Sequence, residues 1–231
     1  MPVRTDWTLD LTVDDALRGQ GANADTLRKR SPRIIETTER AVAAARSLLR
    51  PVVIYRELDV VAQDETRLLL SGGHSLEGEL VMKLLTGAQR VVLVVCTVSG
   101  AISELASREM QENMLYGLAL DGIGSAATEM LANEVFAWQD QQAAALGWKI
   151  SIPVSPGEEG WPLAVGQPQI FTPLAGESDA VRLTDSFLME PIKSMSFVLG
   201  LGKDVKQHGT TCNFCRLKRV CRYRKHQAPN D

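Results

Sequence analysis

"RVVLVVCTV", residues 90–98, is a run of apolar and β-branched residues behind a single arginine. A strand with one face in water alternates apolar and polar residues, and this run does not. We therefore predict a central strand that is covered on both faces. The run is too short to span a bilayer.

Strand and helix patterns alternate on both sides of this run. The expected strands are rich in β-branched residues and lie at 52–61, 66–72, 148–154, 180–184 and 193–202. The expected helices have apolar residues at helical spacing and lie at 33–49, at 75–88 with Ser75 as a possible N-cap, and at 101–146. Residues 163–174 form either one short helix or two turns. The glycines within 101–146 leave open whether that stretch is one helix or two.

This alternation predicts an α+β (mixed α/β) body over residues 1–202, with some antiparallel strands. The last segment, residues 203–231, lacks apolar periodicity and forms a basic tail. That tail carries eight Lys or Arg against two Asp or Glu, although the whole chain has a net charge of −3. The N-terminus has charges without an apolar stretch behind them, so we expect no secretory signal and a cytoplasmic location.

Three segments contain candidate functional residues, and none identifies a catalytic group. The first is the later part of the helical stretch 101–146, which is nearly apolar all round. Within it, Asp121, Ser125 and Glu129 are spaced i, i+4, i+8 and so share a face. Carboxylates in apolar surroundings need a partner. The stripe therefore faces either a ligand or the solvent.

The second segment is the loop "SPGEEGWP", residues 155–162, which follows an expected strand. Pro156, Gly157 and Glu158 form its turn, and loops on a rigid scaffold often carry function. The alternative is a structural turn in which Trp161 fills a space in the core.

The third segment is the tail, where Cys212 and Cys215 form a C-x-x-C pair and Cys221 follows. Its basic neighbours lower thiol pKa values. These three thiols predict a metal site with either His208 or Cys96 as the fourth ligand, and the alternative is that the thiols bind no metal. A [4Fe–4S] cluster and zinc both fit this spacing. Nucleic-acid binding, with Phe214 stacking on a base, is the weaker alternative because the body is acidic.

Four segments in order resemble the activation domain of cobalamin-dependent methionine synthase. They are "VVLVVCTVSG", "LALDGIGSAATEMLANEV", "SPGEEGWPL" with Gln and Ile-Phe beyond it, and "VRLTDSFLMEPIKSMSF", which together cover roughly residues 85–200. The last one matches a family stretch with Met189, Pro191, Ser194 and Ser196 at the corresponding positions. The resemblance implies that Ser194 and the 156–158 turn lie near the cofactor.

The resemblance also implies a function. The family domain holds S-adenosylmethionine over a corrinoid (vitamin B12) on a neighbouring domain and supports reductive methylation of the oxidised cobalt. Family members carry an Arg and a Tyr in the ligand loop, where this sequence has Pro153 and Glu158. A proline cannot pair with the ligand carboxylate, and Glu158 would repel it, which argues against S-adenosylmethionine binding through this loop.

Three functions remain open at this point. The first is an accessory protein that docks on a corrinoid protein or cobalamin-dependent methyltransferase and supports its reductive reactivation or methyl transfer, with an iron–sulfur tail as the electron donor. The second is a non-catalytic, zinc-stabilised module that binds the same partner. The third is an S-adenosylmethionine-dependent corrinoid methyltransferase.

Overall fold

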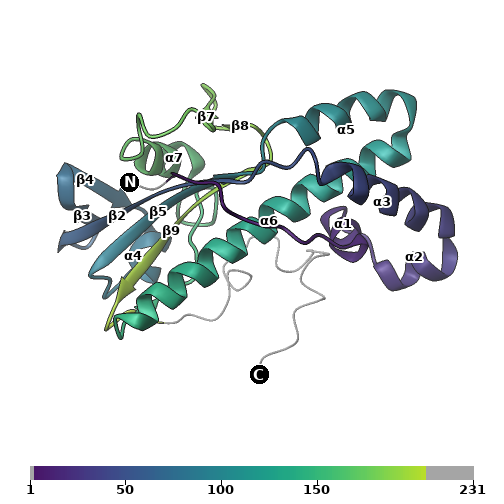
Figure 1. The fold of residues 1–231 in the computed structure, drawn as a ribbon. Coiled ribbons are helices and arrows are strands. Elements are labelled where there is room, and N and C mark those ends of the chain that lie inside the picture. The colour runs from purple at the N-terminus through teal and green to yellow at the C-terminus, as the bar shows by residue number, and fades with distance from the viewer. Residues whose placement is uncertain (1–2, 207–231) are drawn as a thin grey trace.

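The computed structural model describes residues 3–206 and is built around one antiparallel sheet (Figure 1). Strands in this sheet follow the order β4-β3-β2-β5-β9-β6, and β1 pairs with the start of β2 on the edge opposite β5. The bounds are β1 Val3–Arg4, β2 Val52–Gln63, β3 Arg67–Leu70, β4 His74–Glu77, β5 Arg90–Thr97, β6 Lys149–Ile150 and β9 Ser194–Gly202. The predicted α+β class is confirmed.

Strand β5 occupies the centre of the sheet, as its sequence predicts. It pairs along its whole length with β2 on one side and β9 on the other, and residues 91–97 are all buried. Because successive side chains point to opposite faces, β5 supplies Val92, Val94 and Cys96 to one apolar cluster and Val91, Leu93 and Val95 to the other. Each face of the sheet therefore needs its own cover.

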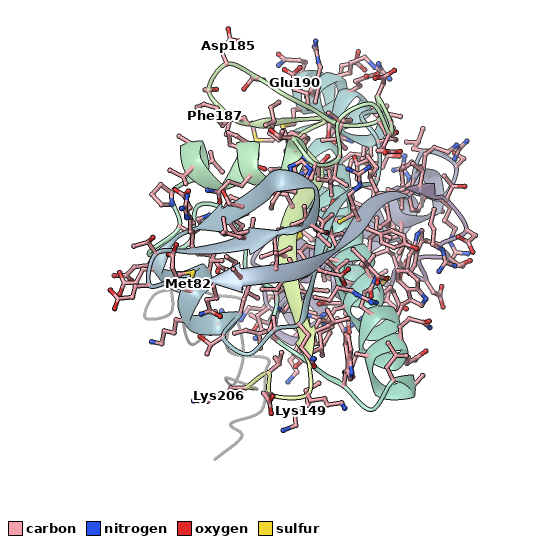
Figure 2. The ribbon with its side chains drawn as sticks, turned by 90° about the vertical axis from the view of Figure 1, so that its left-hand side faces the viewer. Met82, Lys149, Asp185, Phe187, Glu190 and Lys206 are labelled. Carbon is pink, nitrogen blue, oxygen red and sulfur yellow. The ribbon has the colours of Figure 1, made fainter. Side chains whose placement is uncertain are left out.

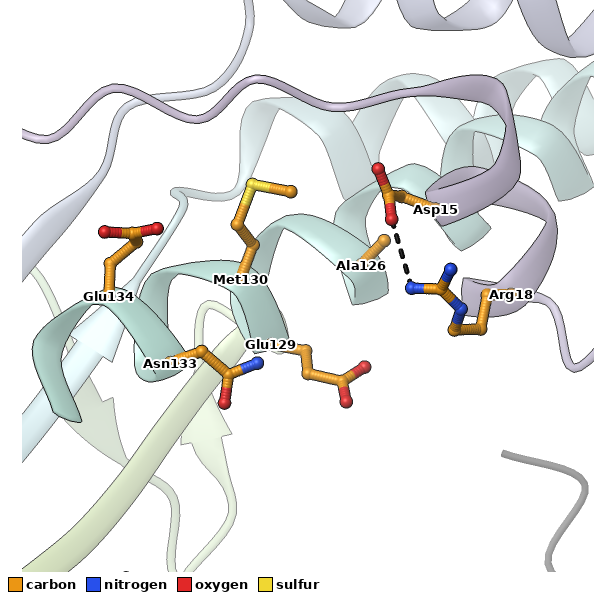
Figure 3. Close-up of a pocket in the computed structure, with 7 residues that line it drawn as sticks. All are labelled: Asp15, Arg18, Ala126, Glu129, Met130, Asn133 and Glu134. Carbon is orange, nitrogen blue, oxygen red and sulfur yellow. Dashed lines mark hydrogen bonds and ion pairs between the residues drawn. The ribbon is translucent and has the colours of Figure 1, made fainter. Parts of the chain in front are cut away.

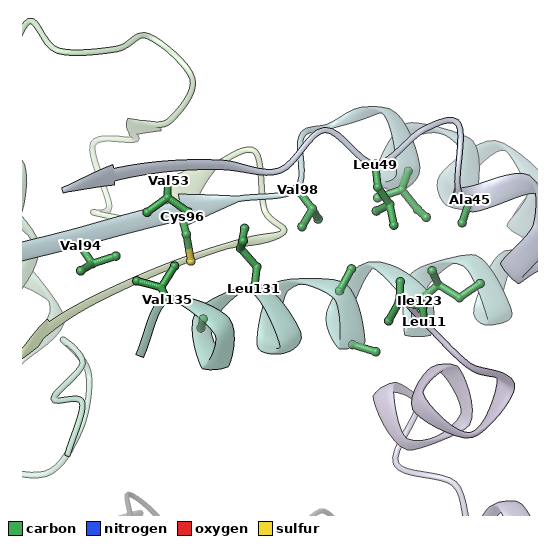
Figure 4. Packing of buried hydrophobic residues seen from close by; sticks show 14 of the residues in the cluster. Leu11, Ala45, Leu49, Val53, Val94, Cys96, Val98, Ile123, Leu131 and Val135 are labelled. Atoms are coloured by element: carbon green, nitrogen blue, oxygen red, sulfur yellow. The ribbon is translucent and has the colours of Figure 1, made fainter. Parts of the chain in front are cut away.

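Helices cover the first face. The long helix α6 crosses the sheet, and α1, α3 and α5 pack against α6 (Figure 1). Their bounds are α1 Val13–Gly19, α2 Ala24–Arg30, α3 Pro32–Ala45, α5 Ala101–Glu112 and α6 Met114–Ala145. Figure 4 shows Val53, Val94 and Cys96 of the sheet facing Leu131 and Val135 of α6.

Two shorter helices, α4 (Glu79–Leu84) and α7 (Leu163–Phe171), cover the second face. A 3-10 turn, η1 (Ser71–Gly73), joins β3 to β4. The strands β7 (Arg182–Leu183) and β8 (Met189–Glu190) form a separate hairpin. Among residues 3–206, no helix is both long and apolar enough to cross a membrane.

The stretch 101–146 forms two helices, and the break falls at Asn113 rather than at a glycine. The Asn113 side chain accepts a hydrogen bond from the Tyr116 amide and caps α6. Gly117 serves another purpose, because a Cβ there would lie 2.6 Å from Met110 of α5. The glycine lets the two helices pack closely.

The expected helix start at Ser75 is wrong. Ser75 lies in β4, opposite Leu69 of β3, and α4 begins after Gly78. Gly78 has a φ of 153°, and a Cβ on it would lie 2.6 Å from the Trp161 ring. A tertiary contact therefore sets this helix start, and the local capping pattern does not. The expected strand at 148–154 is also shorter, with β6 followed by a single bridge from Val154 to Val198.

Candidate functional site

Lys193 joins three of the segments that the sequence singles out. Its ammonium Nζ lies 2.7 Å from Asp121 Oδ1 and donates a hydrogen bond to Ser125 Oγ at 2.9 Å. Its backbone carbonyl accepts hydrogen bonds from the Val98 amide at 3.1 Å and from Thr97 Oγ1 at 3.2 Å. The end of β5, the middle of α6 and the start of β9 therefore meet at one lysine, which we call the Lys193 junction.

The sequence reasoning missed Lys193. The available signal was Asp121, a carboxylate in an apolar helix that needs a cationic partner. The stem of Lys193 lies over Gly124, where a Cβ would stand 3.0–3.2 Å from three of its carbons. The Lys193 side chain is only 12% exposed, whereas that of Asp121 is 46% exposed.

The predicted stripe on α6 is divided between two surroundings. Asp121 and Ser125 lie together at the Lys193 junction, as their spacing predicts. Glu129 is exposed and lines a different cleft, toward α1. Glu129 lies eight residues after Asp121 and therefore points about 80° away from it around the helix axis, which accounts for their different surroundings. Ligand contact by these residues stays a prediction.

Ser194 lies directly after Lys193 and faces inward. Its hydroxyl donates to the Pro191 carbonyl at 2.6 Å, in a turn that contains the cis peptide bond between Glu190 and Pro191. Ser196 lies two residues further along β9, on the same face of the strand, and its hydroxyl donates to the buried Gln167 of α7 at 2.9 Å. The Ser-x-Ser pair thus ties the start of β9 to its surroundings, and its ligand role stays a prediction.

The loop with Pro156, Gly157 and Glu158 is closed by its own hydrogen bonds. The Gly157 amide, at a φ of 97°, donates to the Trp161 carbonyl at 2.8 Å, and the Ser155 amide donates to the Glu158 carboxylate at 3.5 Å. Burial raises the pKa of Glu158 to about 7. This carboxyl therefore changes charge near neutral pH, and its repulsion of an anionic ligand would depend on pH.

Trp161 fills the core behind that loop, which is the structural alternative considered for this segment. It is fully buried, and its indole N–H donates to Gln169 Oε1 at 3.2 Å. A Cβ on Gly78 or Gly166 would lie 2.6–2.7 Å from the Trp161 ring. Two glycines therefore make room for this side chain, and Trp161 anchors the loop to α7.

The two predicted ligand segments lie on opposite sides of the sheet. Trp161 and Val154, which flank the 156–158 turn, belong to the cluster under α4 and α7. Helix α6 packs through Leu131 and Val135 on the other face. The structure therefore does not bring Glu158 to the α6 stripe.

A cleft between α1 and α6 has a volume of about 260 Å³ (Figure 3). Its lining is mostly polar or charged and consists of Asp15, Arg18, Ala126, Glu129, Met130, Asn133 and Glu134. This volume is below the ~300–1,000 Å³ of typical small-molecule pockets. The cleft suits one or two side chains better than a cofactor.

Most of the predicted metal ligands lie outside the described residues, namely His208, Cys212, Cys215 and Cys221. Cys96 is described and lies in the apolar core, where burial raises the pKa of its thiol to about 12. Apolar side chains of the core enclose this thiol completely, so the structure disfavours Cys96 as the fourth metal ligand. Within residues 3–206, no three His, Cys, Asp or Glu side chains gather in a metal-binding arrangement.

The arrangement of sheet and helices matches a solved structure, that of the MetH reactivation domain bound to AdoHcy. The match covers 90% of this chain and 81% of that chain, with a TM-score of 0.60 and 12% sequence identity. The chain has the fold of the MetH reactivation domain. This confirms the predicted resemblance to the methionine synthase activation domain. No family model matches the sequence, and no curated protein matches it significantly.

The reactivation-domain fold gives the Lys193 junction its context. The three segments that meet there are among the four that carry the sequence resemblance, and the 156–158 loop is the fourth. The likeness at 12% identity establishes the fold alone. Because one fold can serve several functions, the side chains of the site have to support any functional conclusion drawn from it.

Proposed function

We propose that this protein is an accessory protein of a corrinoid-dependent methyl-transfer system. It docks on a corrinoid protein and supports its reductive reactivation or methyl transfer. The observation that carries this proposal is the reactivation-domain fold over nine tenths of the chain. The meeting of three family-like segments at the Lys193 junction supports it, because unrelated sequences on one fold have no reason to share such segments.

The docking surface in this proposal flanks the Lys193 junction. Large apolar side chains are exposed on the adjoining segments, namely Met114 at 69%, Leu118 at 44%, Leu188 at 58% and Ile192 at 74%. Leu118 precedes Asp121 by one helical turn, and Ile192 directly precedes Lys193. A group of exposed apolar side chains on neighbouring segments is a feature of surfaces that bind another protein.

The tail supplies the electron in this proposal. Cys212, Cys215 and Cys221 would hold a [4Fe–4S] cluster, with His208 as the fourth ligand because Cys96 is enclosed in the apolar core. When bound, such a cluster supplies one electron. That electron would reduce Co(II) of the partner's corrinoid to Co(I), which takes a methyl group from a donor.

A reactivation assay tests this function. A cobalamin-dependent methionine synthase lacking its own reactivation domain would be prepared as the inactive Co(II) form. Full-length protein, a chemical reductant and S-adenosylmethionine would then be added anaerobically. The proposal predicts the return of the methylcobalamin absorbance. Its absence, together with no binding of the two proteins, would refute the proposal.

Matched variants locate the docking surface. We expect Ile192→Asp to slow the return of methylcobalamin about tenfold or more, because charging a central interface residue commonly costs over 1 kcal/mol. Val61→Asp is the control, since Val61 is 69% exposed but lies near the far end of β2, whereas the start of β2 pairs with Thr97 at the Lys193 junction. Equal effects of the two variants would remove the proposed surface while leaving the function open.

The second candidate is a zinc-stabilised, non-catalytic module that binds the same partner. It is favoured by the cysteine spacing, which suits zinc as well as a cluster. Metal analysis of anaerobically purified protein and the electron paramagnetic resonance spectrum of its reduced form separate the two. Zinc alone, with partner binding but no reactivation, would establish the second candidate.

The third candidate is an S-adenosylmethionine-dependent corrinoid methyltransferase. Pro153 stands where the family has its carboxylate-binding Arg, and Glu158 stands where the family has its Tyr. Calorimetric titration with S-adenosylmethionine, at pH 6 and at pH 8, tests this candidate. Tight binding at both values would place it first, whereas binding only at pH 6 would indicate that Glu158 must be neutral.

A further inference from the structure

The cleft between α1 and α6 is separate from the Lys193 junction and carries unpaired negative charge. Asp15 is fully engaged, because it accepts hydrogen bonds from Thr12 and binds Arg18 at 3.1 Å. Glu129 and Glu134 have no ion-pair partner within the part of the chain that the structure describes. The cleft therefore has two carboxylates available to a cationic group.

The walls of the cleft are fixed by close helix packing. A Cβ on Gly19 of α1 would lie 2.0 Å from the Gly122 carbonyl of α6, so the two backbones touch at this crossing. Met130 and Ala126 give the cleft an apolar part between the charged groups (Figure 3). An aliphatic stem with a cationic end fits such a lining, as Arg and Lys provide.

The chain itself contains a matching segment. Residues 216–225 include six Lys or Arg and no Asp or Glu, and they follow the described part of the chain. The described part ends at Lys206, close to the end of β9, and β9 pairs there with β6. Figure 2 shows Lys206 and Lys149 of β6 at the same end of the molecule. Helix α6 also ends there, four residues before Lys149.

The chain length permits contact. From the end of α6 at Ala145 back to Glu129 is about 24 Å along the helix. An extended chain covers about 3.3 Å per residue, so Arg219 can lie up to about 43 Å from Lys206. The basic segment therefore reaches the cleft without moving any described element.

We propose that residues 216–225 dock in the α1–α6 cleft of their own chain, with Arg or Lys side chains bound to Glu129 and Glu134. A guanidinium binds a carboxylate through two parallel hydrogen bonds, which suits Arg in particular. Docking holds the cysteine motif at 212–221 against α6, on the side where α1 packs. This inference does not depend on the corrinoid role and goes beyond it.

Cross-linking of the full-length protein tests the contact. A carbodiimide joins a lysine amine to a carboxylate only when they touch, so we expect links from Lys218 or Lys225 to Glu129 or Glu134. A mixture of isotopically labelled and unlabelled protein tells whether a link lies within one chain. Links between chains, or links scattered over other carboxylates at equal yield, would overturn the proposal.

Proteolysis of charge variants gives an independent measurement. We expect trypsin to cleave residues 216–225 roughly threefold faster in the double variant E129Q/E134Q than in the unchanged protein. About 1 M salt should remove the difference, because the screening length is then ~3 Å. The control E65Q/E112Q changes two exposed carboxylates outside the cleft. Equal cleavage of all three proteins at low salt would refute docking.

Discussion

Replacing Lys193 with methionine removes the ammonium group at the Lys193 junction and retains most of the stem over Gly124. The lost interactions are the ion pair with Asp121 at 2.7 Å and the hydrogen bond to Ser125 at 2.9 Å. Asp121 is 46% exposed, so water can solvate its carboxylate once the lysine is gone. We therefore expect Lys193→Met to lower the free energy of unfolding by only about 1 kcal/mol.

A double-mutant cycle isolates the pair. Asp121→Asn should cost about 0.5–1 kcal/mol, and the double variant should cost less than the sum, with a coupling of about 0.5–1 kcal/mol. Lys193→Ala should cost about 1–2 kcal/mol more than Lys193→Met, because the packing of the stem over Gly124 is also lost.

Urea denaturation followed by circular dichroism measures the unchanged protein and the four variants. Low salt should increase the coupling and high salt should reduce it. Additivity of the two single variants within about 0.3 kcal/mol would refute the ion pair as an anchor of β9 on α6. Equal stability of Lys193→Met and Lys193→Ala would refute the role of the stem.

Further predictions concern three other buried groups. The folded pKa of Glu158, about 7, lies above the ordinary value of 4.5, so the stability from its protonation is present below pH 4.5 and is lost as pH rises through 7. Urea denaturation of Glu158→Gln should therefore show a gain in stability over the unchanged protein that grows from pH 5 to pH 8, and a constant difference would contradict the buried carboxyl. Trp161→Ala should lower the free energy of unfolding by about 3–5 kcal/mol in the same assay, and a loss below about 1 kcal/mol would show that the ring is not a core group. Cys96 should resist iodoacetamide until the protein unfolds, as mass spectrometry can follow, and its alkylation in the native state would contradict a thiol pKa of about 12.

Local pattern was enough to predict the main elements. The run at 90–98 lacks alternation because β5 is covered by α6 on one face and by α4 and α7 on the other. The helix α3 follows from the helical spacing of its apolar residues, and the strands β2 and β3 follow from their runs of apolar and β-branched residues. Such signals extend over no more than about a dozen neighbouring residues, so they can be recognised in the sequence without knowledge of tertiary contacts.

The site was predicted less completely because its contacts are distant in the chain. Lys193 and Ser125 are 68 residues apart, and no local pattern links them. The same limit explains the wrong helix start at Ser75, since Trp161 packs against Gly78 from far along the sequence. The opposite placement of Glu158 and the α6 stripe follows from the sheet topology, which alternation of elements alone does not specify.

A direct binding measurement tests whether the surface beside the Lys193 junction docks on a corrinoid protein. Calorimetry would titrate the full-length protein into a cobalamin-loaded methionine synthase that lacks its own reactivation domain. We expect saturable binding at one site, weakened about tenfold by Ile192→Asp and unchanged by Val61→Asp. No binding at about 100 μM of either protein, where interactions near −5 kcal/mol become detectable, would contradict it.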